Sequence, residues 1–227
     1  MSDPLRICLV GATGLIGWRL IELAVTRSDV RITGVARREV PLPRGARMEM
    51  VVADPSRWAE AIAFARASVM VCALGTTWRK AGKQEAAFRA VDLDLVLACA
   101  RDAKAAGIEH VIVVSSAGAD KFSRHFYLRV KGEMEEALGK LGLRRLDILR
   151  PGLLRGRRGG EQRIGEGLGI AFSPFIDLLL HGKRRKFRSI RADSVALAIF
   201  ALASERAAGR FVHDNDAMLY AVRRHGG

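Results

Sequence analysis

The chain of 227 residues is 49% hydrophobic, a length and composition that suit one large α/β domain with a sizeable core. Membrane-spanning runs, disulfide frameworks and metal-ligand spacings are all missing, so we expect a reducing, cytoplasmic setting with no transmembrane segment and no structural metal. The formal net charge is +14, but the basic residues are spread along the chain, which favours a solvated basic surface over a nucleic-acid interface.

The first predicted unit is a strand, a glycine-rich turn and a helix. The apolar run Ile7 to Val10 ends at Gly11, and Gly14 and Gly17 follow at a spacing of three. In a dinucleotide-binding turn, the first glycine allows a tight bend, the second lets backbone approach a pyrophosphate, and the third lets the helix pack on the strand. An ordinary glycine-rich turn is the alternative. We favour the dinucleotide site because the motif joins the first strand to the first helix.

The second predicted strand, Arg31 to Ala36, ends in two arginines. In NAD sites an acid near this strand end binds the ribose 2′-hydroxyl, whereas an arginine accommodates the 2′-phosphate of NADP. Here Arg37 and Arg38 follow the strand directly, and the nearest acid, Glu39, lies beyond them. The pattern therefore favours NADP(H) over NAD(H). The alternative is that the two arginines are only further members of a basic surface.

The next two predicted strands end in residues that could lie near a nucleotide. Met48 to Ala53 is followed by Asp54, which could lie near an adenine edge or only cap the helix that begins at Pro55. Val69 to Ala73 is followed two positions on by Gly75, where backbone can pass close to a ligand.

Strands and helices continue to alternate along the chain. A helix is predicted from Glu85 to Ala106, a continuously apolar strand from His110 to Val114, and a sixth strand from Arg145 to Leu149. This order predicts an α/β fold with a doubly wound parallel sheet of the Rossmann type. No linker divides the chain, so we expect a single NAD(P)-binding domain over residues 1–227.

Polar residues suited to carbonyl chemistry follow the fifth strand. Ser115 and Ser116 come directly after it, and Tyr127 and Lys131 share one face of the next predicted helix. A neighbouring lysine lowers the pKa of a phenol, so that a tyrosine can act as a general acid or base. A serine hydroxyl could hold the same oxygen. The alternative for this spacing is a core tyrosine and a surface lysine.

The chain resembles the short-chain dehydrogenases/reductases. Five motifs occur in the order seen in that family: GATGLIG, ALGTT, SSAGAD, YLRVKGE and RPG. The similarity is greatest to the atypical branch, the HIV Tat-interacting protein-like NAD(P)-binding oxidoreductases, and spans roughly residues 6 to 204. The chain is short for an extended member of the family, which argues against a large sugar-nucleotide substrate.

The resemblance implies roles for individual residues. The catalytic set would be Tyr127, Lys131 and a serine, with Ser115 preferred and Ser116 the alternative; Lys131 would also hold the nicotinamide ribose. Arg37 and Arg38 would hold the 2′-phosphate. The remaining cofactor contacts would come from the phosphate turn, the adenosine ribose site and the segment Pro151 to Leu154 against the nicotinamide: Gly11, Thr13, Gly14, Leu15, Ile16, Leu74, Gly75, Pro151 and Leu153.

The last third of the chain has fewer signals. We expect residues from about 152 to 227 to build a small C-terminal substrate lobe. Residues 155–169 are rich in glycine and arginine and suit either a lid or a surface loop, and Phe172 to Leu180 suits an apolar helix. A short basic strand or turn is expected at Lys183 to Arg188, where nucleic-acid binding stays open. A helix from Asp193 to Leu202 and an edge strand from Arg210 to His213 complete the prediction.

The leading hypothesis is an NADP(H)-dependent oxidoreductase that transfers hydride between nicotinamide and a small carbonyl/alcohol substrate. The rival hypothesis is a non-enzymatic NADP(H)-binding redox sensor or protein-interaction module, since the fold alone does not determine function. The sequence leaves both a monomer and a homodimer open.

Overall fold

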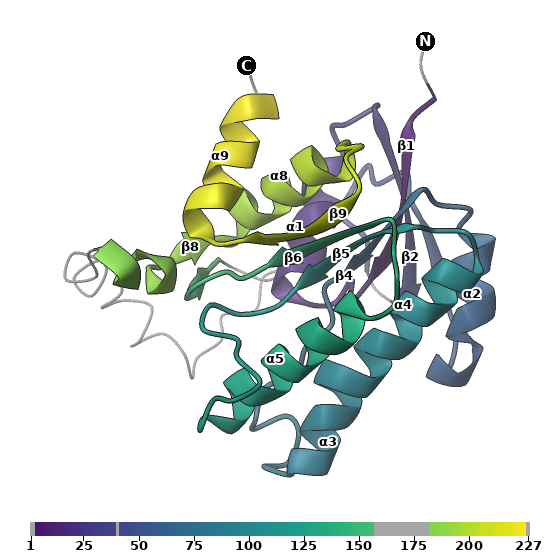
Figure 1. Ribbon diagram of the computed structural model, residues 1–227. Helices are drawn as coiled ribbons and strands as arrows, with labels where there is room; N and C mark the ends of the chain where they lie inside the picture. The colour runs from purple at the N-terminus through teal and green to yellow at the C-terminus, as the bar shows by residue number, and fades with distance from the viewer. Residues whose placement is uncertain (1–2, 40, 157–181, 226–227) are drawn as a thin grey trace.

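The computed structural model describes residues 3–39, 41–156 and 182–225, and its central feature is a seven-stranded sheet (Figure 1). Every neighbouring pair of strands is parallel, in the order β3-β2-β1-β4-β5-β6-β9. The strands are β1 (Leu5–Val10), β2 (Val30–Ala36), β3 (Glu49–Val52), β4 (Val69–Cys72), β5 (His110–Val114), β6 (Arg145–Leu149) and β9 (Gly209–His213). The strand order reverses between β1 and β4, which is where doubly wound sheets bind ligands. The predicted Rossmann-type fold is confirmed.

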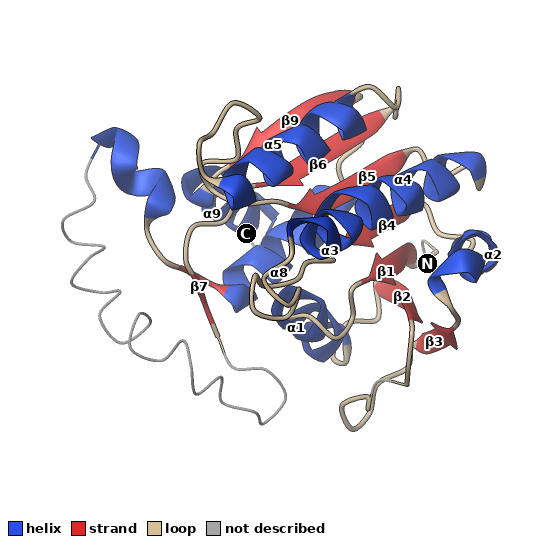
Figure 2. Ribbon diagram, turned by 90° about the horizontal axis from the view of Figure 1, so that it is seen from below, coloured by secondary structure: helices blue, strands red, loops and turns tan. Residues whose placement is uncertain are grey.

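Helices cover both faces of the sheet. One face carries α1 (Leu15–Ala24), α8 (Ala192–Ala203) and α9 (Asn215–His225), and the other carries α2 (Trp58–Phe64), α3 (Glu85–Arg89), α4 (Val96–Ala105) and α5 (Phe126–Gly139) (Figures 1 and 2). Each face has its own apolar core cluster. Cys8, Val113 and Met134 belong to the α4–α5 side, whereas Leu9, Ile112 and Ile199 belong to the α1–α8 side.

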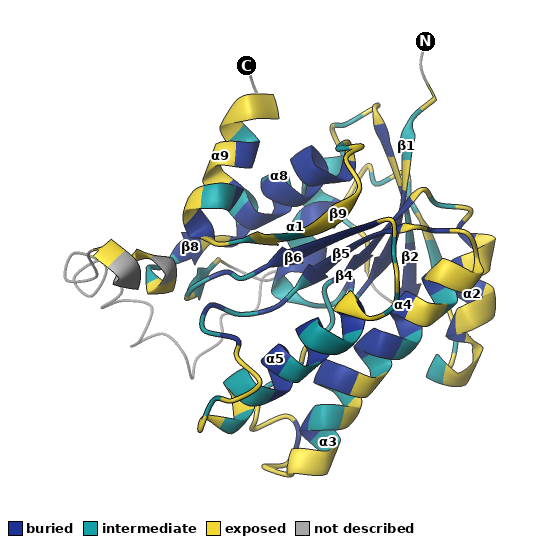
Figure 3. Ribbon diagram, viewed as in Figure 1, coloured by how far each residue is buried: buried dark blue, intermediate teal, exposed yellow. Residues whose placement is uncertain are grey.

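The central strands explain why the sequence folds this way. All four residues of β4 are buried, as are His110 to Val113 of β5, so both faces of these strands are covered (Figure 3). A strand with two covered faces needs a continuous apolar run, which is what the sequence shows at both places. The predicted boundaries of these two strands match the observed ones to within one residue.

The long helix predicted from Glu85 to Ala106 is interrupted. A π-helical turn, Ala90–Leu95, separates α3 from α4. Such a turn inserts one residue into the helical repeat and changes which side chains face the core. The helical run therefore spans the predicted residues to within one position, and only the regular α-helical repeat expected at Ala90–Leu95 is wrong.

The C-terminal elements that the structure describes join the main layers. β9 extends the sheet beside β6, and α8 packs against α1. A second, two-stranded parallel sheet pairs β7 (Leu154–Arg155) with β8 (Ile190–Arg191). Residues Gly182–Phe187 form a 3₁₀ helix, not the expected basic strand or turn. The short repeat of that helix accommodates a compact turn before β8.

Two sequence predictions fall outside the described residues. Most of the expected lid, residues 155–169, and the expected apolar helix Phe172 to Leu180 both lie in the 157–181 gap. The small substrate lobe and the single-domain organisation therefore stay predictions. No helix in the described part of the chain has the length and apolar character needed to cross a membrane.

Candidate functional site

The predicted site residues gather where the parallel strands end. Figure 2 looks from below in Figure 1 towards this carboxyl edge, where the loops after β1, β4 and β5 meet the start of α1 and of α5. The wider edge also includes the segment after β6, because β5 and β6 are paired through Val114 and Leu149.

The glycine turn after β1 is built by close backbone contacts. Gly11 has a φ of +95°, and a Cβ there would lie 2.5 Å from the carbonyl carbon of Ala73. A Cβ at Gly17 would overlap the carbonyl oxygen of Gly11. The tight turn and the close helix–strand packing expected from the sequence are therefore both present.

Gly14 stands at the N-cap of α1. It makes no side-chain capping bond, so no side chain occupies the N-terminus of this helix. The first-turn N–H groups of a helix have no intrahelical acceptor, and together with the helix dipole they suit an anion. Thr13, Leu15 and Ile16 complete the turn, with Thr13 and Leu15 half-buried and Ile16 buried. The turn fits a pyrophosphate.

Basic side chains follow the end of β2, whereas a carboxylate follows the end of β3. Arg37 and Arg38 directly follow β2 and are both exposed. Asp54 follows β3 and accepts hydrogen bonds from the Ser56 N–H (3.0 Å) and hydroxyl (2.7 Å), which lower the pKa of its carboxyl group. Asp54 thus caps the short 3₁₀ turn Pro55–Arg57, as one of the two sequence interpretations expects.

Three polar side chains stand at intervals of four on α5. Tyr127 is 42% exposed, whereas Lys131 and Glu135 are 3% and 1% exposed. The face therefore runs from the rim of the site into the core. The alternative of a core tyrosine and a surface lysine is wrong in both parts. The Tyr127 ring is held edge-on against Phe88, with ring centroids 5.7 Å apart.

Lys131 is held by a buried carboxylate that sequence reasoning missed. Its Nζ lies 2.8 Å from Oδ1 of Asp92, and Oδ2 of Asp92 accepts a hydrogen bond from the Thr76 N–H at 2.8 Å. Burial lowers the pKa of Lys131, but the charges of Asp92 and Tyr127 and the hydrogen bond to Asp92 together outweigh it, and the net shift is upward. Asp92 lies in the π-helical turn. An acid on the apolar face of a predicted helix was the available signal.

The two serines after β5 differ in their partners. The Ser115 hydroxyl donates to Oε1 of buried Glu135 at 2.5 Å. Glu135 in turn accepts from the guanidinium of Arg150, with Nε 2.9 Å from Oε1 and Nη2 2.5 Å from Oε2. Ser116 is half-buried, and its hydroxyl makes only a long 3.4 Å contact with the Ala117 carbonyl. The structure thus gives no support to the sequence-based preference for Ser115.

The remaining predicted contacts lie beside these groups. Leu74 and Gly75 follow β4, and a Cβ at Gly75 would lie 3.6 Å from Oδ1 of Asp92. Pro151 is buried and accepts a hydrogen bond from the Ala117 N–H at 2.9 Å, whereas Leu153 is 46% exposed. The segments after β4, β5 and β6 are therefore brought together.

A small hollow adjoins the serines on the β6–β9 side. Its volume is about 170 Å³, and it is lined by Ala117, Gly118, Arg150, Val212 and Asp214. The Arg150 guanidinium in this lining is neutralised by Glu135. A hollow of this size fits a small group, and its lining begins at Ala117, the residue after Ser116.

Gly132 is a further position that sequence reasoning missed. A Cβ there would overlap the backbone of Asp120 and Lys121, so the loop after β5 lies directly on α5. The Asp120 N–H also donates to the Leu128 carbonyl at 3.1 Å. This contact fixes Tyr127 and Lys131 relative to the serines. A glycine inside a helix pattern was the signal that could have found it.

Comparison with known proteins shows the family of this chain. A family model described as NAD(P)H-binding matches residues 11–206. Protein HTATIP2 of Rattus norvegicus is 39% identical over 170 residues, covering 73% of this chain and 69% of that protein. The Emericella nidulans protein named "Protein fmp52, mitochondrial" is 35% identical over 175 residues, covering 74% of each.

Solved structures share the fold. A putative NAD-dependent epimerase/dehydratase from Bacillus halodurans has a TM-score of 0.68 at 22% identity, covering 97% of this chain and 99% of that one. The Bordetella bronchiseptica enzyme WbmG in complex with NAD and UDP has a TM-score of 0.67 at 16% identity, covering 98% and 78%. At these identities the likeness shows the fold alone.

The relatives correct one prediction. The cytoplasmic location expected from cysteine usage is contradicted, because relatives from Emericella nidulans, Saccharomyces cerevisiae, Debaryomyces hansenii and Candida albicans are named mitochondrial proteins. Unpaired cysteines indicate a reducing environment, but they do not distinguish one such compartment from another.

Proposed function

Because this chain belongs to the NAD(P)H-binding family and is an atypical short-chain dehydrogenase/reductase-like protein, we propose that it is an NADP(H)-dependent oxidoreductase acting on a small carbonyl/alcohol pair. The observation that carries the proposal is the buried Lys131 on the same face of α5 as the accessible Tyr127. A structural role alone does not require a lysine that is 3% exposed one turn from a tyrosine at the rim.

The cofactor would lie across the carboxyl edge from β2 to β6. Its pyrophosphate would bind the turn from Gly11 to Ile16, and its 2′-phosphate would bind the exposed guanidinium groups of Arg37 and Arg38. Leu74 and Gly75 would flank the adenosine ribose. When bound, the nicotinamide would supply or accept the hydride of the reaction.

The residues of the chain would move and hold the proton. In the reductive direction, the Tyr127 hydroxyl donates its proton to the carbonyl oxygen, and in the oxidative direction it takes the proton of the alcohol. Lys131 would hold the nicotinamide ribose and would place its charge beside the tyrosine. Pro151 and Leu153 would lie against the nicotinamide and would keep water from it.

Ser116 is the serine we assign to the substrate oxygen. The Ser115 hydroxyl already donates to Glu135, so it has no proton left for a second acceptor. The Ser116 hydroxyl has only the long contact with the Ala117 carbonyl and can turn towards a ligand. The adjoining hollow of about 170 Å³ suits a small substituent on the carbonyl carbon.

The test is a panel of small aldehydes and ketones incubated with NADPH, with loss of nicotinamide absorbance as the readout. We expect at least one substrate, and for it the Tyr127→Phe variant should turn over roughly a hundredfold or more slowly because the proton donor is gone. NADPH affinity should remain within about threefold, since the phenol hydroxyl is not a phosphate contact. Unchanged turnover by the variant would disprove the assigned role.

One observation favours the rival function, a non-enzymatic NADP(H)-binding sensor or interaction module. The ion pair with Asp92 neutralises Lys131, which weakens its effect on a neighbouring phenol. The rival predicts NADPH binding without turnover of any carbonyl on the panel. It also predicts a partner protein whose retention on the immobilised chain changes when NADPH is added.

A further inference from the structure

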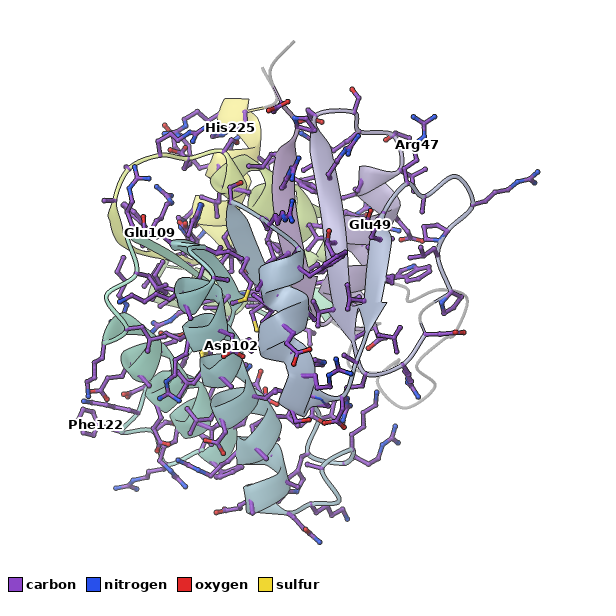
Figure 4. All side chains as sticks on the ribbon, turned by 90° about the vertical axis from the view of Figure 1, so that its right-hand side faces the viewer. Arg47, Glu49, Asp102, Glu109, Phe122 and His225 are labelled. Carbon is purple, nitrogen blue, oxygen red and sulfur yellow. The ribbon has the colours of Figure 1, made fainter. Side chains whose placement is uncertain are left out.

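We propose a second ligand site, at the amino-terminal edge of the sheet, that binds a multiply phosphorylated small molecule. The site is a hollow of about 530 Å³ at the starts of β1, β2 and β3 and beside the end of α2. We call it the amino-edge hollow. Its lining consists of Arg6, Arg27, Ser28, Val30, Arg31, Ile32, Thr33, Arg47, Glu49, Phe64, Ala65 and Arg66. Figure 4 faces this side of the molecule, with Arg47 and Glu49 labelled.

The charge of the amino-edge hollow is strongly one-sided. Its lining holds five arginines and a single carboxylate, Glu49. Arg27 is paired with Asp29, through Nε to Oδ1 at 3.1 Å and Nη2 to Oδ2 at 2.6 Å, and its guanidinium also lies over the Phe200 ring. Within residues 3–39, 41–156 and 182–225, no ion pair is formed by the other four: Arg6, Arg31, Arg47 and Arg66.

Two of these arginines lie directly side by side. Arg6 of β1 is the register partner of Arg31 of β2. Side chains alternate along a strand, and Cys8 and Val35 belong to the core cluster on the α2 side. Arg6 and Arg31 therefore both face that side. Like charges on neighbouring strands are destabilising unless an anion lies between them. Glu49, the one carboxylate in the lining, forms no ion pair with either arginine among the described residues.

The hollow exists because no helix covers this corner of the sheet. The connection from β2 to β3 contains no helix in its described residues, and α2 already ends at Phe64, whose side chain is 65% exposed. The following Arg66 has a φ of 42°, a conformation that residues with a side chain rarely adopt. The bend there ends the helix and leaves Arg66 at the rim of the hollow.

The lining selects the chemistry of the ligand. Guanidinium groups bind phosphate through paired N–H donors, and several around one hollow suit a chain of phosphates better than a single anion. The exposed Phe64 ring offers a flat apolar surface on which a base could stack. Both inorganic polyphosphate and a nucleoside polyphosphate have the required phosphate chain. The aromatic ring favours the nucleoside polyphosphate.

The amino-edge hollow is separate from the proposed cofactor site. Arg31 is near the start of β2, whereas Arg37 and Arg38 follow its end at Ala36. With a rise of about 3.3 Å per residue, the two groups of arginines lie roughly 20 Å apart along the strand. NADP(H) bound at the carboxyl edge leaves the hollow accessible, so both ligands can be bound together.

The test is calorimetric titration of the full chain, saturated with NADP⁺, with tripolyphosphate and with ATP. We expect both to bind. The Arg31→Glu/Arg66→Glu variant should weaken both by roughly tenfold or more, since each lost charge-assisted contact is worth about that factor. The matched control, Arg101→Glu/Arg124→Glu, changes net charge equally at two exposed arginines outside the hollow and is titrated under the same NADP⁺ saturation; the weakening there should be within about threefold.

A third variant separates the two possible ligands. Phe64→Ala should weaken ATP but not tripolyphosphate if the base stacks on the ring, and should leave both unchanged if only the phosphates bind. Thermal melting confirms that each variant is folded. Equal weakening by the control variant would mean that net charge, not the hollow, attracts the phosphates. Failure of both probes to bind, or tighter binding of a short single-stranded oligonucleotide, would overturn the proposal.

Discussion

Charged side chains are arranged differently at the two edges of the sheet. On α5, near the carboxyl edge, Lys131 is paired with Asp92 and Glu135 is paired with Arg150, all within or next to the core. The amino-edge hollow instead holds four arginines without an ion pair among the described residues. A buried charge must be paired to be tolerated, and pairing also fixes its position. An exposed charge needs no partner and remains available to a ligand.

The largest loss of stability is expected when the ion pair between Lys131 and Asp92, near the carboxyl edge, is broken. Asp92→Ala leaves the Lys131 ammonium buried and unpaired, so the free energy of unfolding should fall by about 3–5 kcal/mol. Urea unfolding measures this loss. The double variant Asp92→Leu/Lys131→Met removes both charges and should regain most of the stability while remaining inactive. A stable single variant would show that the pair is not needed.

A substitution of Asp92 that keeps its shape should also alter the pH dependence of cofactor binding. Asp92 raises the pKa of Lys131 against the effect of burial, so Asp92→Asn should lower that pKa. The charged form of Lys131 is lost as the pH rises through the lowered pKa. NADPH affinity of the variant should then decline at a lower pH than that of the wild type. Superimposable affinity profiles for the two proteins would contradict this reading.

A second buried cluster of charged side chains, around Asp147, should make the stability of the protein depend on pH. Asp147 is paired with Arg145, and His110 and His213 each place Nε2 2.8 Å from one of its oxygens. Burial would raise the pKa of Asp147, but these partners hold it well below its ordinary value. The stability gained this way is complete above the unfolded pKa of about 4 and is lost as the pH falls below it.

Asp147→Asn should therefore lower the free energy of unfolding by roughly 3 kcal/mol at neutral pH, with a smaller difference from wild type in strong acid. Urea unfolding at several pH values measures the difference. Glu60→Gln, an exposed carboxylate paired only with exposed Arg57, serves as the control and should change stability little. A difference between Asp147→Asn and wild type that stays constant down to acid pH would contradict the assignment.

Substitution of Ser115 should affect mainly stability, whereas substitution of Ser116 should affect mainly turnover. Ser115→Ala removes the hydrogen bond to Glu135 and should reduce stability by about 1–3 kcal/mol, with turnover little changed. Ser116→Ala should instead lower turnover by roughly tenfold or more and leave stability nearly unaltered. Steady-state kinetics and thermal melting on the same preparations distinguish the two. The reverse pattern would return the catalytic role to Ser115.

The smallest effect is expected at the amino-edge hollow. Arg31→Gln removes one of two adjacent like charges, so without added phosphate the protein should become more stable by a few tenths of a kcal/mol. Tripolyphosphate should then raise the melting temperature of the wild type more than that of the variant. Destabilisation by this substitution would indicate that Arg31 has a structural role.

The sequence predicts the parts of this molecule that depend on local pattern. Gly11 and Gly17 were predictable because a turn and a close helix contact require glycine, and β5 because a doubly covered strand is continuously apolar. Asp92 stands on the apolar face of the predicted helix, but its pairing with Lys131 was not predictable, because periodicity gives no sign of the π-helical turn in which it lies. The choice between Ser115 and Ser116 depends on Glu135, which is twenty residues further along the chain.

The amino-edge hollow could not be predicted from the sequence either. Arg6, Arg31, Arg47 and Arg66 are far apart in the chain and resemble the many other arginines of a basic surface. Only the strand order, which places β1 beside β2 and β2 beside β3, brings them around one hollow. The charges of Lys183 to Arg188, by contrast, are adjacent in sequence and form a recognisable basic run.

The central claim is that the carboxyl edge binds NADP(H) through Arg37 and Arg38. The most direct measurement is titration of the wild type and of Arg37→Ala/Arg38→Ala with NADPH and NADH, followed by nicotinamide fluorescence. We predict that the wild type binds NADPH at least about tenfold more tightly, since charge-assisted contacts to the 2′-phosphate are lost with NADH. The variant should lose this preference but still bind NADH. Equal affinities in the wild type, or tighter binding of NADH, would contradict the account.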